Sequence, residues 1–217
     1  ASPHWRAYIG LGPTFSPKTD VIVKYQGQSL GSNSTKDSAS ISGSAEAEAV
    51  INPIFSASGL FDYSSYKYAD GSKGDSELSL MIMPKVLTAF GLWAGIGIGL
   101  IHTGIGEVSI RSGTSTITYD ESSVTSFGIS PRIGYDFEIK PGLTLGAFIS
   151  YMHTSADITA SIVDTTLGVN DKITADFSRG WYAFNVRAGF DLKPLAVKPS
   201  FGRSGTRRRR FGLLVFI

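Results

Sequence analysis

Seven charged residues occupy alternating positions in segments that otherwise read as apolar strands. Most have apolar residues on both sides, so a period of two would collect the charges on one face and the apolar side chains on the other. Charges held in a narrow space away from water must be paired. The pattern predicts a network of ion pairs in an enclosed interior, or alternatively a polar path for solutes. The seven are Arg6, Glu77, Lys85, Arg132, Asp136, Arg187 and Asp191, and Tyr8, Trp93 and Asn185 fall on the same side.

Catalytic chemistry has little support in the sequence. His102 and His153 are predicted near the outer ends of strands on the apolar side, and His4 lies at the N-terminus. With serines nearby, a Ser-His hydrolase acting on lipids is the enzymatic alternative. There is no cysteine and no histidine pair with metal-ligand spacing. The GIGIG run lies within a strand pattern, with no helix after it to hold a phosphate. We therefore predict no enzyme, no metal and no cofactor.

The clearest positioning element is the stretch 91–103, GLWAGIGIGLIHT. Leu92, Ile96 and Ile98 share one side with Ala94 and Leu100, while the other side carries Trp93 and three glycines. Each glycine would cost a helix about 1 kcal/mol relative to alanine, so a strand is favoured. In a small closed barrel, glycine on the inner wall makes room for bulky or charged neighbours, and the apolar face points outward.

The same alternation recurs along the chain and gives a count of eight strands. The segment 45–68 holds two of them, with a turn at Asn52-Pro53 or at Ser56–Gly59 left open. Aromatic residues stand near strand ends on the apolar side, as in interfacial girdles; they are Phe15, Tyr135, Phe137, Tyr151, Tyr182 and Phe190. The other predicted strands cover Trp5–Ser16, Glu77–Lys85, Gly91–Thr103, Thr125–Phe137, Leu143–Met152 and Tyr182–Leu192.

The connections between these strands are alternately long and short. The polar regions 17–44 and 107–122 are predicted as long hairpins or loops and 155–179 as a long loop, whereas 69–75 and 139–142 are predicted as turns. Outer-membrane barrels have short turns on the periplasmic side and longer loops outside. The sequence therefore predicts an all-β fold: an eight-stranded antiparallel transmembrane up-and-down β-barrel over residues 1–194.

Composition agrees with this class. The chain has 217 residues, 42% of them hydrophobic and 18% charged, and no apolar run long enough for a transmembrane helix. A net charge of +2 does not indicate a nucleic-acid partner. The chain opens ASPHWRAY, which predicts that any signal peptide has been removed or never existed. Residues 195–217, with four arginines at 207–210, are predicted as a peripheral or non-native basic tail.

Three stretches resemble known outer-membrane barrels: RAYIGLGPTFSPKTD, FGISPRIGYDFEIKPGLTLGAFISYM and WYAFNVRAGFDL. The chain resembles the OmpW family more than the barrel of the OmpA type. The resemblance implies a place in the bacterial outer membrane, with the lipid bilayer and lipopolysaccharide as surroundings. It also implies passage of small apolar molecules, with a sideways exit between strands into the bilayer.

Two other functions remain open on the sequence. One is a structural or adhesion barrel, whose lumen is plugged by the charge network and whose long outer loops bind a partner. The other is a soluble lipocalin-like ligand binder, in which the apolar face would point inward instead. The oligomeric state is not predicted.

Overall fold

The computed structural model of the chain describes residues 4–25, 28–35, 40–67, 73–105, 108–112, 115–119, 122–164 and 169–192. These residues contain no helix long and apolar enough to cross a membrane. Their strands are β1 (His4–Tyr25), β2 (Gln28–Thr35), β3 (Ser40–Val50), β4 (Phe55–Lys67), β5 (Lys73–Leu87), β6 (Leu92–Ile105), β7 (Val108–Ser112), β8 (Ser115–Tyr119), β9 (Ser122–Lys140), β10 (Leu143–Asp164) and β11 (Val169–Leu192).

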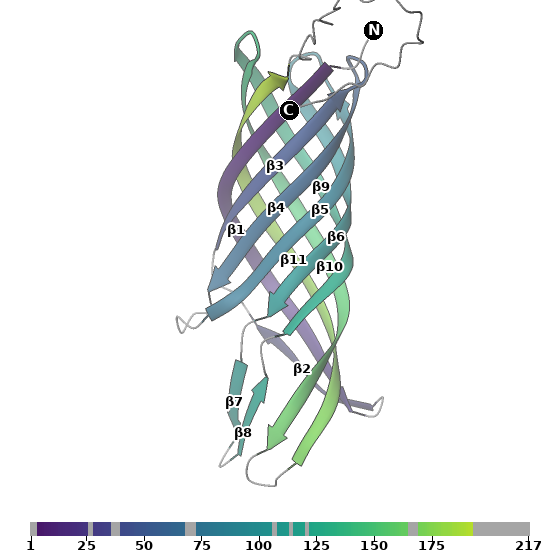
Figure 1. Cartoon of the computed structure of the whole chain (residues 1–217), viewed down its shortest axis with the longest axis vertical. Helices are drawn as coiled ribbons and strands as arrows, with labels where there is room; N and C mark the ends of the chain where they lie inside the picture. Colours follow the sequence, from purple (N-terminus) through teal and green to yellow (C-terminus); the bar gives the residue numbers. More distant parts are fainter. Residues whose placement is uncertain are drawn as a thin grey trace, which may run out of the picture.

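Eight of these strands close into a barrel (Figure 1). The order around the wall is β1, β3, β4, β5, β6, β9, β10 and β11, and β11 pairs with β1 to complete the circle. Each of these strands pairs antiparallel with both of its neighbours in the wall. The predicted eight-stranded up-and-down barrel is confirmed.

The two faces of the wall have opposite character. Outward-facing apolar side chains are exposed, for example Ile9 at 63% and Ile96 at 51%, whereas Trp93 and Lys85 on the inner face are each exposed by only 2%. A soluble barrel would bury the apolar face, because water on that face is unfavourable. The polarity is that of a barrel surrounded by lipid, and the lipocalin-like alternative is wrong.

Short turns join the strands at one end of the barrel. Of the two turn positions left open by the sequence, the structure has Asn52-Pro53, where the Asn52 side chain accepts hydrogen bonds from the N–H groups of Ile54 and Phe55 (2.8 and 2.9 Å). The other two described turns contain Gly91 and Gly142, whose φ angles are +95° and +82°. Glycine adopts such angles without the steric penalty of other residues.

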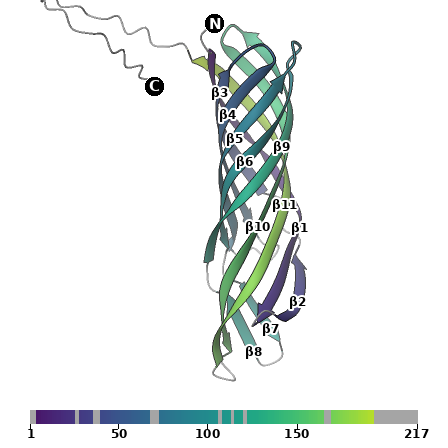
Figure 2. The ribbon, with the colours of Figure 1, turned by 90° about the vertical axis from the view of Figure 1, so that its right-hand side faces the viewer.

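At the opposite end the wall continues well past the closed barrel. The outer parts of β10, β11 and β1, together with β2 and the β7–β8 hairpin, form this extension (Figures 1 and 2). β2 pairs with the outer part of β1, and β8 pairs with the tip of β10 through Val163 and Asp164. We refer to these segments as the outer extension.

The extension corrects several sequence predictions. The region 155–179 is not a loop, because β10 and β11 pair continuously from Leu143 and Phe190 to Asp164 and Val169. β1 runs to Tyr25, nine residues beyond the predicted end at Ser16, and its outer part pairs with β2, which confirms the hairpin alternative for 17–44. Polar side chains there mark a strand that has left the membrane, where neither face needs to be apolar.

Smaller corrections concern the turns and connections. β5 begins at Lys73, inside the segment 69–75 predicted as a turn, and β9 runs to Lys140, which leaves Pro141 and Gly142 between strands. The polar connection 107–122 contains the β7–β8 hairpin, which agrees with the hairpin predicted there. The predicted tail 195–217 lies outside the described residues.

Glycines on the inner wall allow close contact between strands. A Cβ atom at Gly99 would collide with the backbone of Leu80 and Met81, whereas one at lipid-facing Gly59 would meet nothing within 4 Å. We expect Gly99→Val to destabilise the barrel by about 1–3 kcal/mol through overpacking, and Gly59→Val to leave it nearly unchanged. Urea titration in detergent, followed by the heat-modifiable gel shift, checks both variants. Equal midpoints would contradict the close packing of β5 on β6.

Candidate functional site

The interior holds an ion-pair network centred on Glu46. Its two carboxylate oxygens contact different cations: Oε1 lies 2.8 Å from Lys85 Nζ and Oε2 lies 2.5 Å from Arg187 Nη1. Lys85 Nζ also lies 2.7 Å from Glu48 Oε1. Arg187 forms a bidentate ion pair with Asp136. These five residues, from β3, β5, β9 and β11, are called the inner ionic cluster.

Aromatic rings cover the cations of this cluster. The Arg187 guanidinium lies 4.0 Å from the centre of the Tyr8 ring and 4.3 Å from that of Trp93. Lys85 Nζ lies 4.5 Å from Trp93. Tyr8 donates from its hydroxyl to Glu48 Oε2 (3.1 Å). Buried charges therefore have ionic, hydrogen-bond and cation–π partners at once, which offsets the loss of hydration.

A mostly apolar layer lies farther out along the same strands. On β5, Met83 and Met81 lie between Lys85 and Glu77. On β11, Ala183 and Trp181 lie nearer the outer end than Arg187. The buried apolar cluster of this region also includes Leu60, Ile101, Phe148 and Met152. We call these the middle layer.

One ion pair sits within the middle layer. Arg132 Nη2 lies 2.5 Å from Asp62 Oδ2, and the same carboxylate accepts a hydrogen bond from Ser79 (3.0 Å). The Arg132 guanidinium also lies 5.5 Å from the centre of the Phe148 ring.

A second group of charges lies at the outer end of the barrel. Arg179 Nη1 lies 3.0 Å from Asp75 Oδ2 and 3.3 Å from Glu77 Oε1. The Arg179 guanidinium also lies 4.2 Å from the centre of the Tyr66 ring. All four side chains are buried, and Arg179 is exposed by only 1%. They form the outer ionic cluster.

This cluster lies beyond the apolar band of the outer wall, where the outward residues on β4 and β5 are Ser65 and Ser76, a directly paired couple. Burial, and then the nearby Glu77 carboxylate, raises the pKa of the Tyr66 hydroxyl well above its ordinary value. The hydroxyl therefore stays protonated and donates to Glu77 Oε2 at 3.0 Å.

The structure places the ten sequence-predicted interior residues as follows. Seven are buried and three, Arg6, Asp136 and Asp191, are partly exposed. Arg6 donates to Asp191 (3.2 Å) at the end of the barrel with short turns, where His4 also contacts Asp191 at 2.9 Å. Asn185 accepts a hydrogen bond from Ser42 (3.2 Å). The buried seven are Tyr8, Glu77, Lys85, Trp93, Arg132, Asn185 and Arg187.

Sequence reasoning found Glu77, Asp136 and Asp191 but missed other carboxylates that pair with the buried cations. Glu46 and Glu48 alternate with alanines in AEAEAV, a period-two signal that becomes readable only once the Asn52-Pro53 turn fixes the parity of β3. Asp62 lies on the neighbouring strand, whose parity depends on the same turn. Arg179, Asp75 and Tyr66 stand at the margins of segments predicted as loops or turns.

His102 and His153 stand outside this network, whereas His4 contacts Asp191. His102 Nδ1 lies 2.9 Å from Thr125 Oγ1, and His153 stacks on Tyr151 with ring centres 6.4 Å apart, both on the outward side of the wall. Within the described part of the chain, neither ring hydrogen-bonds to a serine. No group of three potential metal ligands is found among the described residues.

Comparison with known proteins places this geometry among membrane barrels. No family model and no curated protein matches the sequence. The outer-membrane protease OmpT from Escherichia coli superposes with a TM-score of 0.60 at 9% identity, covering 87% of this chain and 96% of OmpT. The outer-membrane protein OprG from Pseudomonas aeruginosa superposes with a TM-score of 0.56 at 14% identity, with the same coverage. The chain has the fold of bacterial outer-membrane β-barrels.

This likeness confirms the predicted resemblance at the level of the fold. The outer-membrane barrel has an apolar exterior, two ionic clusters and a middle layer between them. Although OmpT is a protease, the sequence gives no support for catalysis. The described charges of the interior pair with one another across strands of the wall.

Substitution of Lys85 measures how much the inner ionic cluster contributes to the free energy of unfolding. Lys85→Met leaves Glu46 and Glu48 with one cation fewer, and we expect about 3–5 kcal/mol of destabilisation, because a buried charge loses its partner. Adding Glu48→Gln should recover part of that loss, since the second carboxylate is then neutral. Urea midpoints of the wild type, both single variants and the double variant form the cycle. If the double variant showed simple additivity, the contact between Lys85 and Glu48 would carry no coupling energy.

Proposed function

We propose that this protein is an outer-membrane barrel whose lumen is closed and whose outer extension binds a partner outside the cell. The observation that supports it best is the burial of the charges in the lumen. Lys85, Arg179 and Arg187 are exposed by 1–3% each, whereas side chains lining a water-filled pore keep accessible surface. An eight-stranded barrel is just wide enough for its side chains to fill.

The lengths of the strands also support a role outside the membrane. β10 has 22 residues and β11 has 24, whereas a membrane-spanning strand needs about 9–11. Roughly half of each strand therefore builds the outer extension. The ladder between β10 and β11 continues without interruption to the tip, which gives a binding surface a rigid support rather than a flexible loop.

Passage of small apolar molecules is the second candidate, and the middle layer favours it. Met81, Met152 and Trp181 offer an apolar environment between the two ionic clusters. Beside it the β9–β10 ladder lacks the pairs that Pro131 and Ser130 would make with Tyr151 and Met152. Proline has no N–H to donate, so this part of the wall is held by fewer hydrogen bonds. An apolar solute would leave sideways here.

Conductance and uptake separate the two candidates. Ser155 and Ser178 are directly paired, so residues 156–177 can be replaced by a tight turn. For a closed lumen we expect neither channel current in planar bilayers nor uptake of an apolar dye into liposomes, for the intact or the shortened chain. Cells expressing the intact chain should adhere to surfaces coated with serum and matrix proteins, and the shortened chain should lose this. Dye uptake that survives shortening would instead favour passage.

A further inference from the structure

The wall of the barrel splits between β9 and β10 at the base of the outer extension. Pairing of these strands ends at Thr154 and Gly128, and β10 regains a neighbour on that side only where Val163 meets Thr118 of β8. Among the described residues, the eight residues Ser155–Ile162 pair with β11 alone. Figure 1 shows β10 diverging from β9 and the β7–β8 hairpin hanging beside it.

A strand edge of this kind offers a row of backbone N–H and C=O groups to another strand. Natural edges are usually protected by proline, lysine or a bulge. The segment SADITASI contains neither proline nor lysine, and its pairing with β11 runs without a register shift. The edge is therefore regular, its one charged residue is Asp157, and no described strand pairs with it. The pairs at both ends limit an added strand to about the same length.

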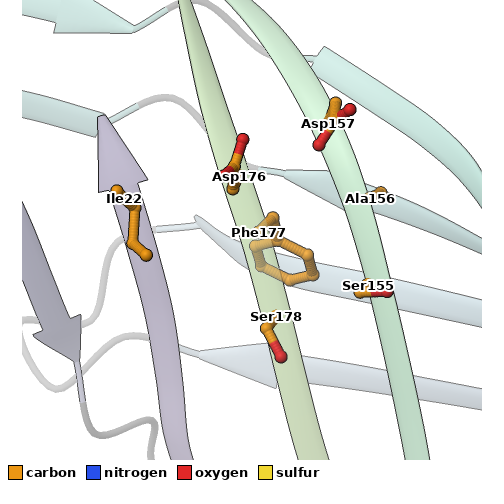
Figure 3. Close-up of a pocket in the computed structure, with 7 residues that line it drawn as sticks. All are labelled: Ile22, Ser155, Ala156, Asp157, Asp176, Phe177 and Ser178. Carbon is orange, nitrogen blue, oxygen red and sulfur yellow. The ribbon is translucent and has the colours of Figure 1, made fainter. Parts of the chain in front are cut away.

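A pocket lies on the outward side of the same segment (Figure 3). Its volume is about 440 Å³, and Ser155, Asp157, Asp176 and Ser178 line it together with Ile22 from β1. Asp157 and Asp176 are directly opposite one another on β10 and β11, so they share one face of the ladder. The Asp157 side chain is exposed on this face, where a basic side chain of an added strand can reach its carboxylate.

We propose that the edge Ser155–Ile162 binds an extended peptide segment by strand addition, and that a basic side chain of this segment enters the pocket beside Asp157. A strand antiparallel to β10 places one side chain directly opposite Asp157, with Cβ atoms about 4.5–5.5 Å apart. Backbone hydrogen bonds hold the segment, and the carboxylates select its charge. This assigns a partner class to the outer extension and rests on the function proposed above.

Three labelled octapeptides test the assignment against the full chain in lipid nanodiscs. The first alternates valine and threonine around a central lysine, the second replaces the lysine by glutamate, and the third keeps the lysine but is N-methylated at alternate backbone nitrogens. Fluorescence anisotropy should show binding of the first, about tenfold weaker binding of the second, as expected for one charge-assisted contact, and loss of binding by the third.

Protein variants locate the site. Asp157→Asn should remove the preference for lysine over glutamate, while Glu138→Gln, an exposed carboxylate at the opposite end of the barrel, should leave it intact. Absence of binding by the lysine peptide, equal binding of the N-methylated peptide, or a preference that survives Asp157→Asn would each overturn the proposal.

A separate measurement distinguishes failure of the strand-addition proposal from failure of the proposed function. The chain has no cysteine, so Ser155→Cys can be labelled selectively on intact cells by a maleimide that does not cross membranes. We expect labelling. Labelling without peptide binding would overturn the strand addition alone, whereas no labelling of the folded protein would overturn both this proposal and the outer position of the extension.

Discussion

The contact on which the interior depends is the carboxylate of Glu46 held between Lys85 and Arg187. One group from β3 ties together β5 and β11, two strands that are not neighbours in the wall. A slip of one residue in any of these strands would turn its charge toward lipid, where it would cost several kcal/mol. The cluster therefore fixes the register of strands that no direct backbone ladder connects.

The space for this cluster comes from small residues on the inner wall. Gly134 lies against the Trp93 ring, Gly189 against Tyr8 and Gly95 against Lys85. Trp93, Tyr8 and Lys85 thus each sit over a position without a side chain on a neighbouring strand. The apolar exterior makes no such demand, because lipid adapts to any outline. This explains why Gly95, Gly97 and Gly99 of β6 share the inner parity with Trp93.

The sequence alone was sufficient to predict the barrel fold, because alternation along a single strand is a local signal. Leu92, Ile96 and Ile98 face outward as the period of two required. Partners of the charges were beyond reach, since Glu46 meets Arg187 across 141 positions of sequence, and such pairs depend on how the whole wall closes. The polar half of β10 and β11 was misread as a loop because the apolar alternation stops where the strands leave the lipid, while the hydrogen-bonded ladder does not.

The filled interior and the long extension follow from one constraint. Eight strands enclose an interior just wide enough for side chains to fill, and here paired charges occupy it and fix the register. Changes in sequence that leave the barrel folded are then confined to the part of the chain outside the membrane. There the wall no longer has to close, since water can satisfy its backbone groups. Between β9 and β10 it does not close, and the regular edge of β10 that results is available to another strand.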